Sequence, residues 1–497
     1  MSNILLPPAA IKISRHKKNI QNKPHNPDNM THLPFINNSV SLSREKPEST
    51  MPLTFLLPLG SLHRKIKNMN RSTLSFYTLL SPLLVSTAKR FSTLHPKLRT
   101  FFSVRRELFE ELKKQTDTIT PSSFRLWVHA ASVGEFEQAR PIIAALKERH
   151  PEITLFVSFL SDSGYNARKN FHDAAAVFYL PADTPDNASK LLSLIKPDLL
   201  LLMRYDFWPN HLLEAKNRGV KLILAAAVLQ KESPYFKPIL KGFYESIFHL
   251  FDRIFTVSEE DTTAFRTIFN CKQTETAGDP RFDQVFLRSQ NCGKVAHLKP
   301  LFENRTVLVA GSVWDKDEQV LLPAWLELEK RASLVLVPHE VNPENMKRLY
   351  NDLQQRSLDF MPISALNATF NPEKQILVID QTGYLAELYS IASIAYVGGG
   401  FGINVHNTLE PAVHGIPVLF GPHCHNSPEA EGLAAAGGAV IIHDQKELGT
   451  ALKEFTTDTA TRKKSGLNAT SFVHRSIGAT AAITASIEHY YEEKTTG

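Results

Sequence analysis

The strongest constraint on the fold is an alternation of short apolar runs with segments of helical spacing, and the chain passes through this alternation twice. The first series of apolar runs, between residues 125 and 258, comprises RLWVHAA, ITLFVSF, AAVFYL, DLLLLM, VKLILAAA and RIFTVS. The second, between residues 305 and 442, comprises RTVLVAG, ASLVLVP, KQILVI, SIAYVGG, IPVLF and GAVII. Strands that alternate with helices form parallel sheets covered on both faces. The pattern therefore predicts an α/β protein with two doubly wound, Rossmann-like domains and a ligand cleft at the carboxyl ends of both sheets.

Charge and cysteine usage exclude several classes of protein. The net charge of +6 comes from the first 68 residues, which carry ten Lys or Arg against three acids, so the remaining chain is not basic. No nucleic-acid partner is expected, because such a partner needs basic residues clustered on a folded face. The three cysteines, Cys271, Cys292 and Cys424, lack metal-ligand spacing. They indicate a reducing compartment without disulfides or structural zinc.

The N-terminal region divides into two parts. Residues 1–68 are rich in Asn, Pro and Ser without periodicity, and we predict a disordered, dispensable extension. Residues 69–120 are predicted to be a membrane-associated helical segment. Its apolar stretch, residues 72–88, is shorter than the roughly 20 residues of a spanning helix, and a core helix of the first domain is the alternative for it. The basic residues expected to meet anionic head groups are Lys89, Arg90, Lys97, Arg99, Arg105 and Arg106.

A carboxylate stands where the first strand gives way to a helix. In WVHAASVGEFEQA, residues 127–139, Ser132 and Gly134 precede Glu135 at the start of a helical pattern. A strand that ends this way commonly builds one wall of a binding crevice. On its own, Glu135 could equally be a first-turn acid that complements the helix dipole.

A second candidate site follows the strand SIAYV. It ends in Gly398, Gly399 and Gly400, and a helix is expected to start at His406 and Asn407. Glycines allow close approach of a phosphate or ribose, and a helix amino end offers free N–H groups to an anion. A nucleoside monophosphate fits better than a dinucleotide, because GGG is not the GxGxxG pattern. The alternative is that the glycines only form a turn.

Six segments occur in the order and spacing of one family: WVHAASVGE, MRYDFWPN, GDPRFD, GSVWDKDE, VPHEVNPE and YVGGGFGINVHNTLEPAVHGIPVLFGP. Over residues 70–490 the chain resembles the 3-deoxy-D-manno-octulosonic acid (Kdo) transferases of lipopolysaccharide synthesis. The resemblance implies a metal-independent glycosyltransferase of GT-B type that moves Kdo from CMP-Kdo to a lipid A precursor, lipid IVA, with inversion. It also implies no cofactor, and a location on the cytoplasmic face of the inner membrane through the N-terminal segment.

The resemblance implies the following division of the chain. Residues 121–280 form the acceptor-side domain, residues 300–475 form the nucleotide-sugar-binding domain, and residues 476–497 form a C-terminal helix.

The resemblance also assigns roles to residues. Glu135 is the implied proton acceptor, and a carboxylate at a helix amino end is expected to be ionised at neutral pH. Arg281 of GDPRFD is the implied stabiliser of negative charge on the donor. The chain departs from the family at Arg204, where members commonly have Glu in METELWPN, and at His339, because members commonly have PRH where this chain has PHE. The implied donor-binding residues are Pro338, His339, Thr382, Gly383, Tyr384, Asn407, Thr408, Leu409 and Glu410.

Two other functions are compatible with the sequence. A nucleotide-sugar epimerase would share the two-domain architecture, but it would not need a membrane-seeking segment. An inactive, membrane-tethered nucleotide-binding homologue would accommodate Arg204 and the missing arginine beside His339.

Overall fold

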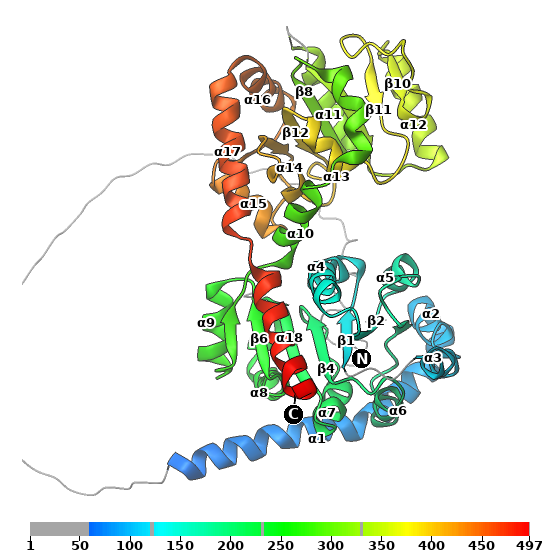
Figure 1. The fold of residues 1–497 in the computed structure, drawn as a ribbon, viewed down its shortest axis with the longest axis vertical. Coiled ribbons are helices and arrows are strands. Elements are labelled where there is room, and N and C mark those ends of the chain that lie inside the picture. The colour runs from blue at the N-terminus through cyan, green and yellow to red at the C-terminus, as the bar shows by residue number, and fades with distance from the viewer. Residues whose placement is uncertain (1–58, 120–123, 230–232, 329–331, 497) are drawn as a thin grey trace, which may run out of the picture.

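The computed structural model describes residues 59–119, 124–229, 233–328 and 332–496, with only the backbone described for 59–72 and 234. The chain forms two lobes, each built on one seven-stranded parallel sheet (Figure 1). This confirms the predicted α/β layout of two doubly wound domains.

The N-lobe sheet has the strand order β3-β2-β1-β4-β5-β6-β7. Its strands are β1 (Arg125–Ala130), β2 (Thr154–Phe159), β3 (Ala176–Tyr179), β4 (Leu199–Met203), β5 (Lys221–Ala227), β6 (Arg253–Thr256) and β7 (Thr274–Thr276). The strand order reverses between β1 and β4, which pair directly with His129 opposite Leu202. A crevice forms at such a switch point, because the two following chain segments diverge to opposite faces of the sheet.

The C-lobe sheet repeats this plan with the order β10-β11-β9-β8-β12-β13-β14. Its strands are β8 (Val307–Val313), β9 (Ser333–Pro338), β10 (Phe360–Pro362), β11 (Ile376–Val378), β12 (Ile394–Val397), β13 (Val418–Phe420) and β14 (Ala439–Ile441). Here the order reverses between β8 and β12, so the second switch point lies between them.

Helices cover both faces of each sheet and bury the strands. Every residue of β4 and β9 is buried, which explains their near-continuous apolar sequences. The N-lobe helices after β1 are α4 (Val133–Arg149), α5 (Asp162–Arg168), α6 (Pro185–Ile195), α7 (Pro209–Asn217), α8 (Pro238–Phe248) and α9 (Glu259–Ile268). The C-lobe helices are α11 (Asp315–Leu326), α12 (Pro343–Gln355), α13 (Leu385–Leu388), α14 (Leu409–Ala412), α15 (Pro428–Ala435), α16 (Gln445–Thr457) and α17 (Thr459–Arg475). Side-chain oxygens cap several of these helices, as Ser132 does for α4.

The segment between the two expected domains is folded. Helix α10 (Pro280–Ser289) buries Phe282 and Val285 in the C-lobe core, and the 3-10 helix η4 (Gly293–Phe302) buries Val295 and Leu298 there. Helix α10 also packs against α4 of the N lobe. The residues between the two expected domains therefore form a structural bridge between the lobes.

The last helix returns to the N lobe. Helix α18 (Ala479–Thr496) runs down beside the N-lobe sheet in Figure 1 and places Ile483 and Ile487 in the same core cluster as β1 and β2. The Tyr491 ring packs edge-on against Phe124 at 5.6 Å between centroids. The chain thus passes between the lobes twice.

Helix α1 (Leu59–Arg90) is longer than the sequence indicated, beginning at Leu59 rather than near Met69. Residues 59–68 are therefore helical, unlike the predicted disordered extension, while residues 1–58 of that prediction lie outside the described residues. Helices α2 (Pro96–Ser103) and α3 (Leu108–Asp117) follow it. Within the described ranges, no helix is long and apolar enough to cross a bilayer.

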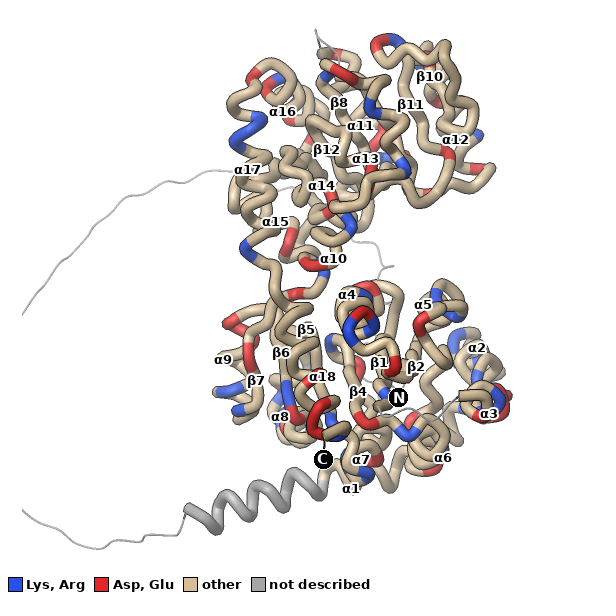
Figure 2. Tube along the Cα trace, in the orientation of Figure 1, with Lys and Arg blue, Asp and Glu red and all other residues tan. Residues whose placement is uncertain are grey.

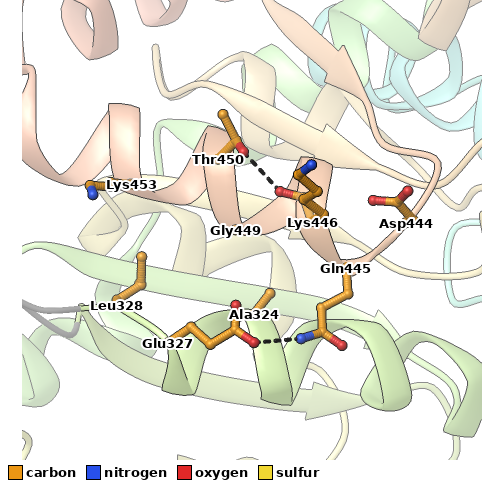
Figure 3. A pocket seen from close by; sticks show the side chains of 9 residues that line it. All are labelled: Ala324, Glu327, Leu328, Asp444, Gln445, Lys446, Gly449, Thr450 and Lys453. Atoms are coloured by element: carbon orange, nitrogen blue, oxygen red, sulfur yellow. Dashed lines mark hydrogen bonds between the residues drawn. The ribbon is translucent and has the colours of Figure 1, made fainter.

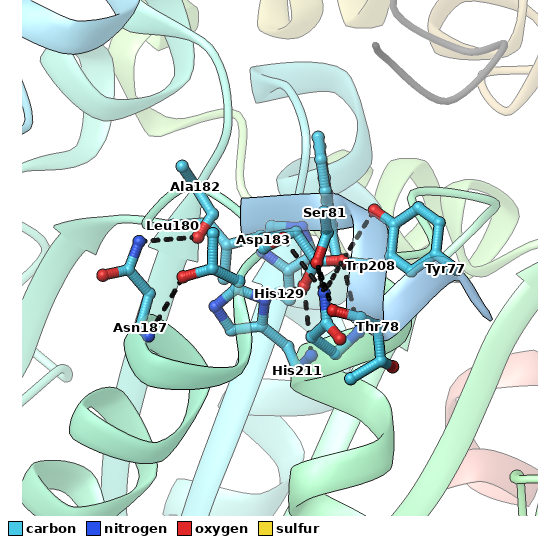
Figure 4. A network of polar contacts seen from close by, with 12 residues as sticks. Tyr77, Thr78, Ser81, His129, Leu180, Ala182, Asp183, Asn187, Trp208 and His211 are labelled. Atoms are coloured by element: carbon cyan, nitrogen blue, oxygen red, sulfur yellow. Dashed lines mark hydrogen bonds and ion pairs between the residues drawn. The ribbon is translucent and has the colours of Figure 1, made fainter. Parts of the chain in front are cut away.

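A buried polar network fastens α1 to the N lobe (Figure 4). Asp183, between β3 and α6, accepts a 2.9 Å hydrogen bond from the Tyr77 hydroxyl and a 2.6 Å contact from Nδ1 of His211. Asn210 donates to Oγ of Ser81 at 2.9 Å. These bonds hold α1 beside the loops that leave the carboxyl ends of β3 and β4, so α1 is a structural part of the N lobe at its functional edge.

Arg105 does not have the predicted lipid-facing role. Its guanidinium donates to the carbonyls of Leu180 and Leu160 at 2.7 Å each and lies 3.8 Å from the centre of the Phe101 ring. Burial lowers its pKa to about 10. Arg105 therefore ties the α2–α3 region to the sheet edge.

Acidic and basic residues interleave over both lobes, as Figure 2 shows.

Candidate functional site

The N-lobe switch point brings together charged side chains from two strands. Glu135 lies in the first turn of α4, directly after β1, while Arg204 and Asp206 follow β4. Because β1 and β4 are neighbours, Glu135 shares one edge of the sheet with Arg204 and Asp206, which lie 69 and 71 positions later in the sequence. The structure thus places the predicted proton acceptor where a substrate crevice is expected.

The carboxylate of Glu135 is partly buried and held by the backbone. Its Oε2 accepts a 2.6 Å hydrogen bond from the N–H of Ala131. Burial, followed by repulsion from Asp206, raises the pKa of Glu135 to about 7, although the Ala131 bond and the charge of Arg204 oppose this shift. At this pKa the carboxyl is only about half ionised at pH 7, so the full ionisation expected from the sequence is not met, because burial and Asp206 disfavour the charged form. A carboxyl of this pKa is well matched to proton transfer near pH 7.

Asp206 belongs to a buried chain of polar groups that sequence reasoning missed. Its Oδ2 lies 2.9 Å from Nε2 of His129 and 2.9 Å from Nε1 of Trp208. The other ring nitrogen of His129 contacts Oγ of Ser158 at 2.8 Å. A signal was present in the sequence, since His129 stands inside an otherwise apolar strand, and a buried polar group requires a partner.

A second charged cluster joins the two predicted arginines. Asp279, the N-cap of α10, is buried and accepts from Nε of Arg281 at 2.9 Å, while Nη2 of Arg204 lies 3.4 Å away. Burial alone would raise the pKa of Asp279, but the two guanidiniums outweigh it and hold this pKa below its ordinary value. Nε of Arg204 also donates to Gln138 of α4 at 3.0 Å. Arg204 thus serves as a counter-ion at this edge.

Arg281 reaches across to the C lobe. Its Nη1 and Nη2 lie 2.8 and 3.3 Å from the two carboxylate oxygens of Glu429, in the first turn of α15. Burial alone would lower the pKa of Arg281, but Asp279 and Glu429 outweigh this effect and raise it. Arg281 is therefore a permanent cation near the lobe junction, and part of its guanidinium is occupied by Glu429.

The three glycines after β12 are explained by close packing within the chain. A Cβ at Gly398 would come within 2.2 Å of the Ser312 carbonyl oxygen, and one at Gly400 within 2.5 Å of the Gly421 nitrogen. Gly399 has a φ of 92°, a conformation that favours glycine. The expectation that these positions open the backbone to a phosphate is not met at Gly398 and Gly400, because neighbouring backbone fills that space.

Asp317 of α11 locks this glycine loop in place. Its carboxylate accepts 2.9 Å bonds from the Tyr396 hydroxyl and the N–H of Gly399, and a 3.0 Å bond from the N–H of Trp314. The side chain is fully buried. One carboxylate therefore fixes the ends of both strands of the C-lobe switch point.

His339 belongs to a stack of three rings at the carboxyl ends of the C-lobe strands. Its ring centroid is 4.3 Å from that of Trp314 and 4.3 Å from that of His406. Burial lowers the pKa of His339, with Glu340 opposing the effect, so its ring is neutral at pH 7. His339 can donate or accept a hydrogen bond there but supplies no positive charge. Pro338 ends β9 directly before it and is buried.

Lys294 lies against the turn, residues 382–384, that was predicted to contact the nucleotide. Its Nζ lies 3.3 and 3.2 Å from the carbonyl oxygens of Thr382 and Gly383, and 3.8 Å from the centre of the Tyr384 ring. This lysine comes from η4, so its sequence position gave no signal of the contact. It brings a positive charge to the turn formed by Thr382, Gly383 and Tyr384.

The remaining donor-side residues form a short helical turn. Helix α14 spans only Leu409–Ala412, so the helix expected to start at His406 and Asn407 begins later than predicted. Thr408 and Leu409 are buried, Asn407 is exposed, and Oδ1 of Asn407 accepts from the N–H of Leu409 at 3.0 Å. Oε1 of Glu410 lies 3.1 Å from Nη1 of Arg288 on α10. Burial raises the pKa of Glu410.

A surface hollow elsewhere on the C lobe has no connection to these residues. It lies between α11 and α16 and is lined by nine residues, including Glu327, Gln445 and Lys453 (Figure 3). None of the predicted site residues lines it. The predicted residues instead gather at the carboxyl edges of the two sheets.

Comparison with known proteins agrees with this arrangement. A family model described as 3-Deoxy-D-manno-octulosonic-acid transferase (kdotransferase) matches residues 68–284. A 3-deoxy-D-manno-octulosonic acid transferase of Aquifex aeolicus (strain VF5) is 31% identical over 361 residues, covering 70% of this chain and 90% of the relative. The enzyme of the same name from Chlamydophila psittaci is 30% identical over 323 residues, covering 64% and 74% respectively.

Among solved structures, a UDP-GlcNAc 2-epimerase from Neisseria meningitidis bound to UDP-GlcNAc has a similar fold. The TM-score is 0.51 at 16% identity, and the match covers 74% of this chain and all of the epimerase. At this identity the likeness concerns the fold alone.

Proposed function

The chain belongs to the 3-deoxy-D-manno-octulosonic acid transferase family, and we propose that it transfers Kdo from CMP-Kdo to lipid IVA at the membrane surface, with Glu135 as proton acceptor. It is a glycosyltransferase of lipopolysaccharide synthesis. The observation that carries the residue assignment is a carboxyl of pKa about 7 at the N-lobe switch point. An acceptor hydroxyl must lose its proton as it attacks the anomeric carbon, and Glu135 can take it.

Arg281 and Lys294 are proposed to attract the donor phosphate. The leaving group is a monophosphate, which one or two cations can neutralise without a metal ion. Arg281 lies at the lobe junction and Lys294 lies against Thr382 and Gly383. Glu410, paired with Arg288 in this structure, is proposed to accept hydrogen bonds from the ribose hydroxyls.

The exposed face of α1 supports contact with the membrane. Phe76, Leu79 and Leu83 follow helical spacing and are 62%, 75% and 65% exposed. The opposite face is fastened to the N-lobe loops through Tyr77 and Ser81. An apolar face at the edge that carries Glu135 would bring the base close to the sugar of a lipid acceptor.

The reaction is tested by measuring CMP release from CMP-Kdo with and without lipid IVA, together with analysis of the sugar product. Acceptor-dependent CMP release and a Kdo-bearing lipid are expected. CMP release without a Kdo-bearing lipid would contradict the proposal. An epimerised nucleotide sugar would instead support the epimerase alternative, and CMP-Kdo binding without turnover would support the inactive homologue.

Membrane contact is tested by a triple substitution, Phe76→Ser, Leu79→Ser and Leu83→Ser. It should reduce sedimentation with anionic vesicles while leaving CMP-Kdo binding intact, because it spares the Tyr77 and Ser81 contacts. A chain that starts at Met69 should still sediment and transfer Kdo, whereas one that starts near Pro121 should be more soluble and transfer Kdo poorly to acceptor embedded in a bilayer. Unchanged sedimentation of the triple variant would contradict the membrane face.

A further inference from the structure

Asp206 is a buried carboxylate whose two oxygens differ in their environment. The side chain is 1% exposed, and its Oδ2 meets both His129 and Trp208 at 2.9 Å. Its Oδ1 has no hydrogen-bond partner within the part of the chain that the structure describes. A buried carboxylate with one unused oxygen is costly to maintain, and such groups cluster at functional sites.

The hydrogen-bond chain behind Asp206 leaves its charge in place. Nε1 of Trp127 donates to Oγ of Ser158 at 2.8 Å, and the same oxygen lies 2.8 Å from Nδ1 of His129. All donors in this chain are used when Ser158 donates to Nδ1 and Nε2–H of His129 donates to Asp206. In that arrangement the imidazole is neutral. His129 thus fixes the orientation of the Asp206 carboxylate.

Two charged groups that follow the neighbouring strand β4 influence the ionisation of Glu135, and they act in opposite directions. Asp206 disfavours its ionisation and Arg204 favours it. Arg204 is itself shared with Asp279 and Gln138. The neighbouring Tyr205 is neutral at pH 7, because burial raises its pKa further. The remaining influence on Glu135 is the backbone at the start of α4, including the Ala131 N–H.

We propose that Asp206 is a positioning residue for the transfer reaction: held by His129 and Trp208, its fixed charge makes Glu135 a stronger proton acceptor from across the N-lobe switch point. This inference rests on the proposed role of Glu135. During transfer the acceptor O–H bond breaks and its proton passes to the Glu135 carboxylate. The acceptor oxygen bonds to the anomeric carbon, and the bond from that carbon to the phosphate breaks, so CMP leaves with the electron pair.

Asp206 matters most once Glu135 holds the proton. Protonation removes the repulsion between two carboxylates at one edge, so the negative charge of Asp206 favours the state in which the hydroxyl has been deprotonated. The proton then leaves to water, and Glu135 is regenerated. A carboxylate near its ordinary pKa would hold that proton less strongly.

The test is the pH dependence of kcat/KM for the acceptor, measured in the full chain. Asp206→Asn should move the acid limb to lower pH by about one pH unit, whereas Arg204→Met should move it to higher pH. Asp206→Glu, which keeps the charge, should leave the limb near its wild-type position. A purely structural role would lower the rate at every pH without moving the limb.

An acid limb that stays in place in a folded Asp206→Asn variant overturns the inference. Asp206→Ser serves as a second neutral variant if Asn at this position impairs folding. If the acid limb of the wild-type kcat/KM profile lay near the ordinary carboxyl pKa of 4.5, that result alone would overturn the inference. Glu135→Gln separates failure of the proposed function from failure of this inference. Retained turnover in Glu135→Gln would overturn the assignment of Glu135 as the base. Lost turnover in Glu135→Gln, together with an unmoved acid limb in Asp206→Asn, would overturn only the role of Asp206.

Discussion

The two switch points of the chain have the same strand topology but different residues after their strands. After β1 and β4 stand Glu135, Arg204 and Asp206, all charged or titratable. After β8 and β12 stand Trp314 and a run of three glycines, pinned by one buried carboxylate. The comparison shows that the same topology carries different side chains at its two switch points, so the chemistry of each edge is set by the local sequence and not by the fold.

The difference also has an energetic side. In the N lobe, desolvation and neighbouring charges shift the pKa of Glu135 to about 7. In the C lobe, the His339 ring stacks between Trp314 and His406, and partial burial lowers its pKa so that it is neutral at pH 7. We therefore expect substitutions in the N-lobe group to change the rate, and substitutions in the C-lobe group to change donor binding.

The largest expected effect is that of Glu135→Gln. It should lower turnover by about 100-fold or more, the scale of a lost general base, while CMP-Kdo binding is retained. Single-turnover kinetics and calorimetric titration measure the two quantities. Glu148→Gln, on the exposed face of the same helix, is the matched control. Turnover within a few fold of wild type would contradict the catalytic role of Glu135 in the N-lobe group.

Glu410→Ala should affect the C-lobe group, which is proposed to bind the donor. It should weaken donor binding by about 1–3 kcal/mol, because the ribose hydroxyls would lose a partner, with a smaller effect on the rate at saturation. The KM for CMP-Kdo and the kcat are measured together, with the exposed Glu454→Ala as control. A fall in kcat at unchanged KM would show that the C-lobe edge takes part in chemistry.

The pH dependence of the wild-type enzyme sharpens the comparison. Burial and Asp206 raise the pKa of Glu135 to about 7, and only the ionised carboxylate accepts a proton. Activity should therefore be lost as the pH falls through 7, with about a threefold drop in kcat/KM between pH 7.5 and 6.5. CMP binding should be flatter over this range, since His339 is already neutral. Equal slopes for both quantities would contradict the separation.

The smallest expected effect is that of metal removal. Dialysis against EDTA should change kcat/KM by less than about twofold, because the proposed charge stabilisation comes from side chains. Metal content by mass spectrometry and activity are measured on the same sample. A large loss that added Mg²⁺ or Zn²⁺ restores would mean that a cation joins the donor side.

The sequence predicted the elements better than the contacts between them. The period of the apolar runs predicted both sheets, and the SVGE segment led to Glu135. The ion pair between Arg204 and Asp279 was not predictable, because the two residues come from separate segments, the loop after β4 and the start of α10. Lys294 was missed for the same reason.

Two further misreadings come from contacts between segments that are far apart in the sequence. Gly398 and Gly400 looked like space for a phosphate, but periodicity does not show that Ser312 and Gly421 fill that space. Arg105 looked like one of several surface cations, yet it donates to the Leu180 and Leu160 carbonyls. In both cases the deciding partner is distant in sequence.

The return of α18 to the N lobe bears on how this protein could be dissected or recombined. A fragment that ends near residue 280 would lack Ile483 and Ile487, which complete the hydrophobic cluster beside β1 and β2. Its exposed apolar seam would favour aggregation over autonomous folding. The two lobes are therefore not interchangeable cassettes. A chimera that exchanges the donor lobe would have to keep the native C-terminal helix with its own N lobe, so the natural joints for recombination lie before α10 and after α17.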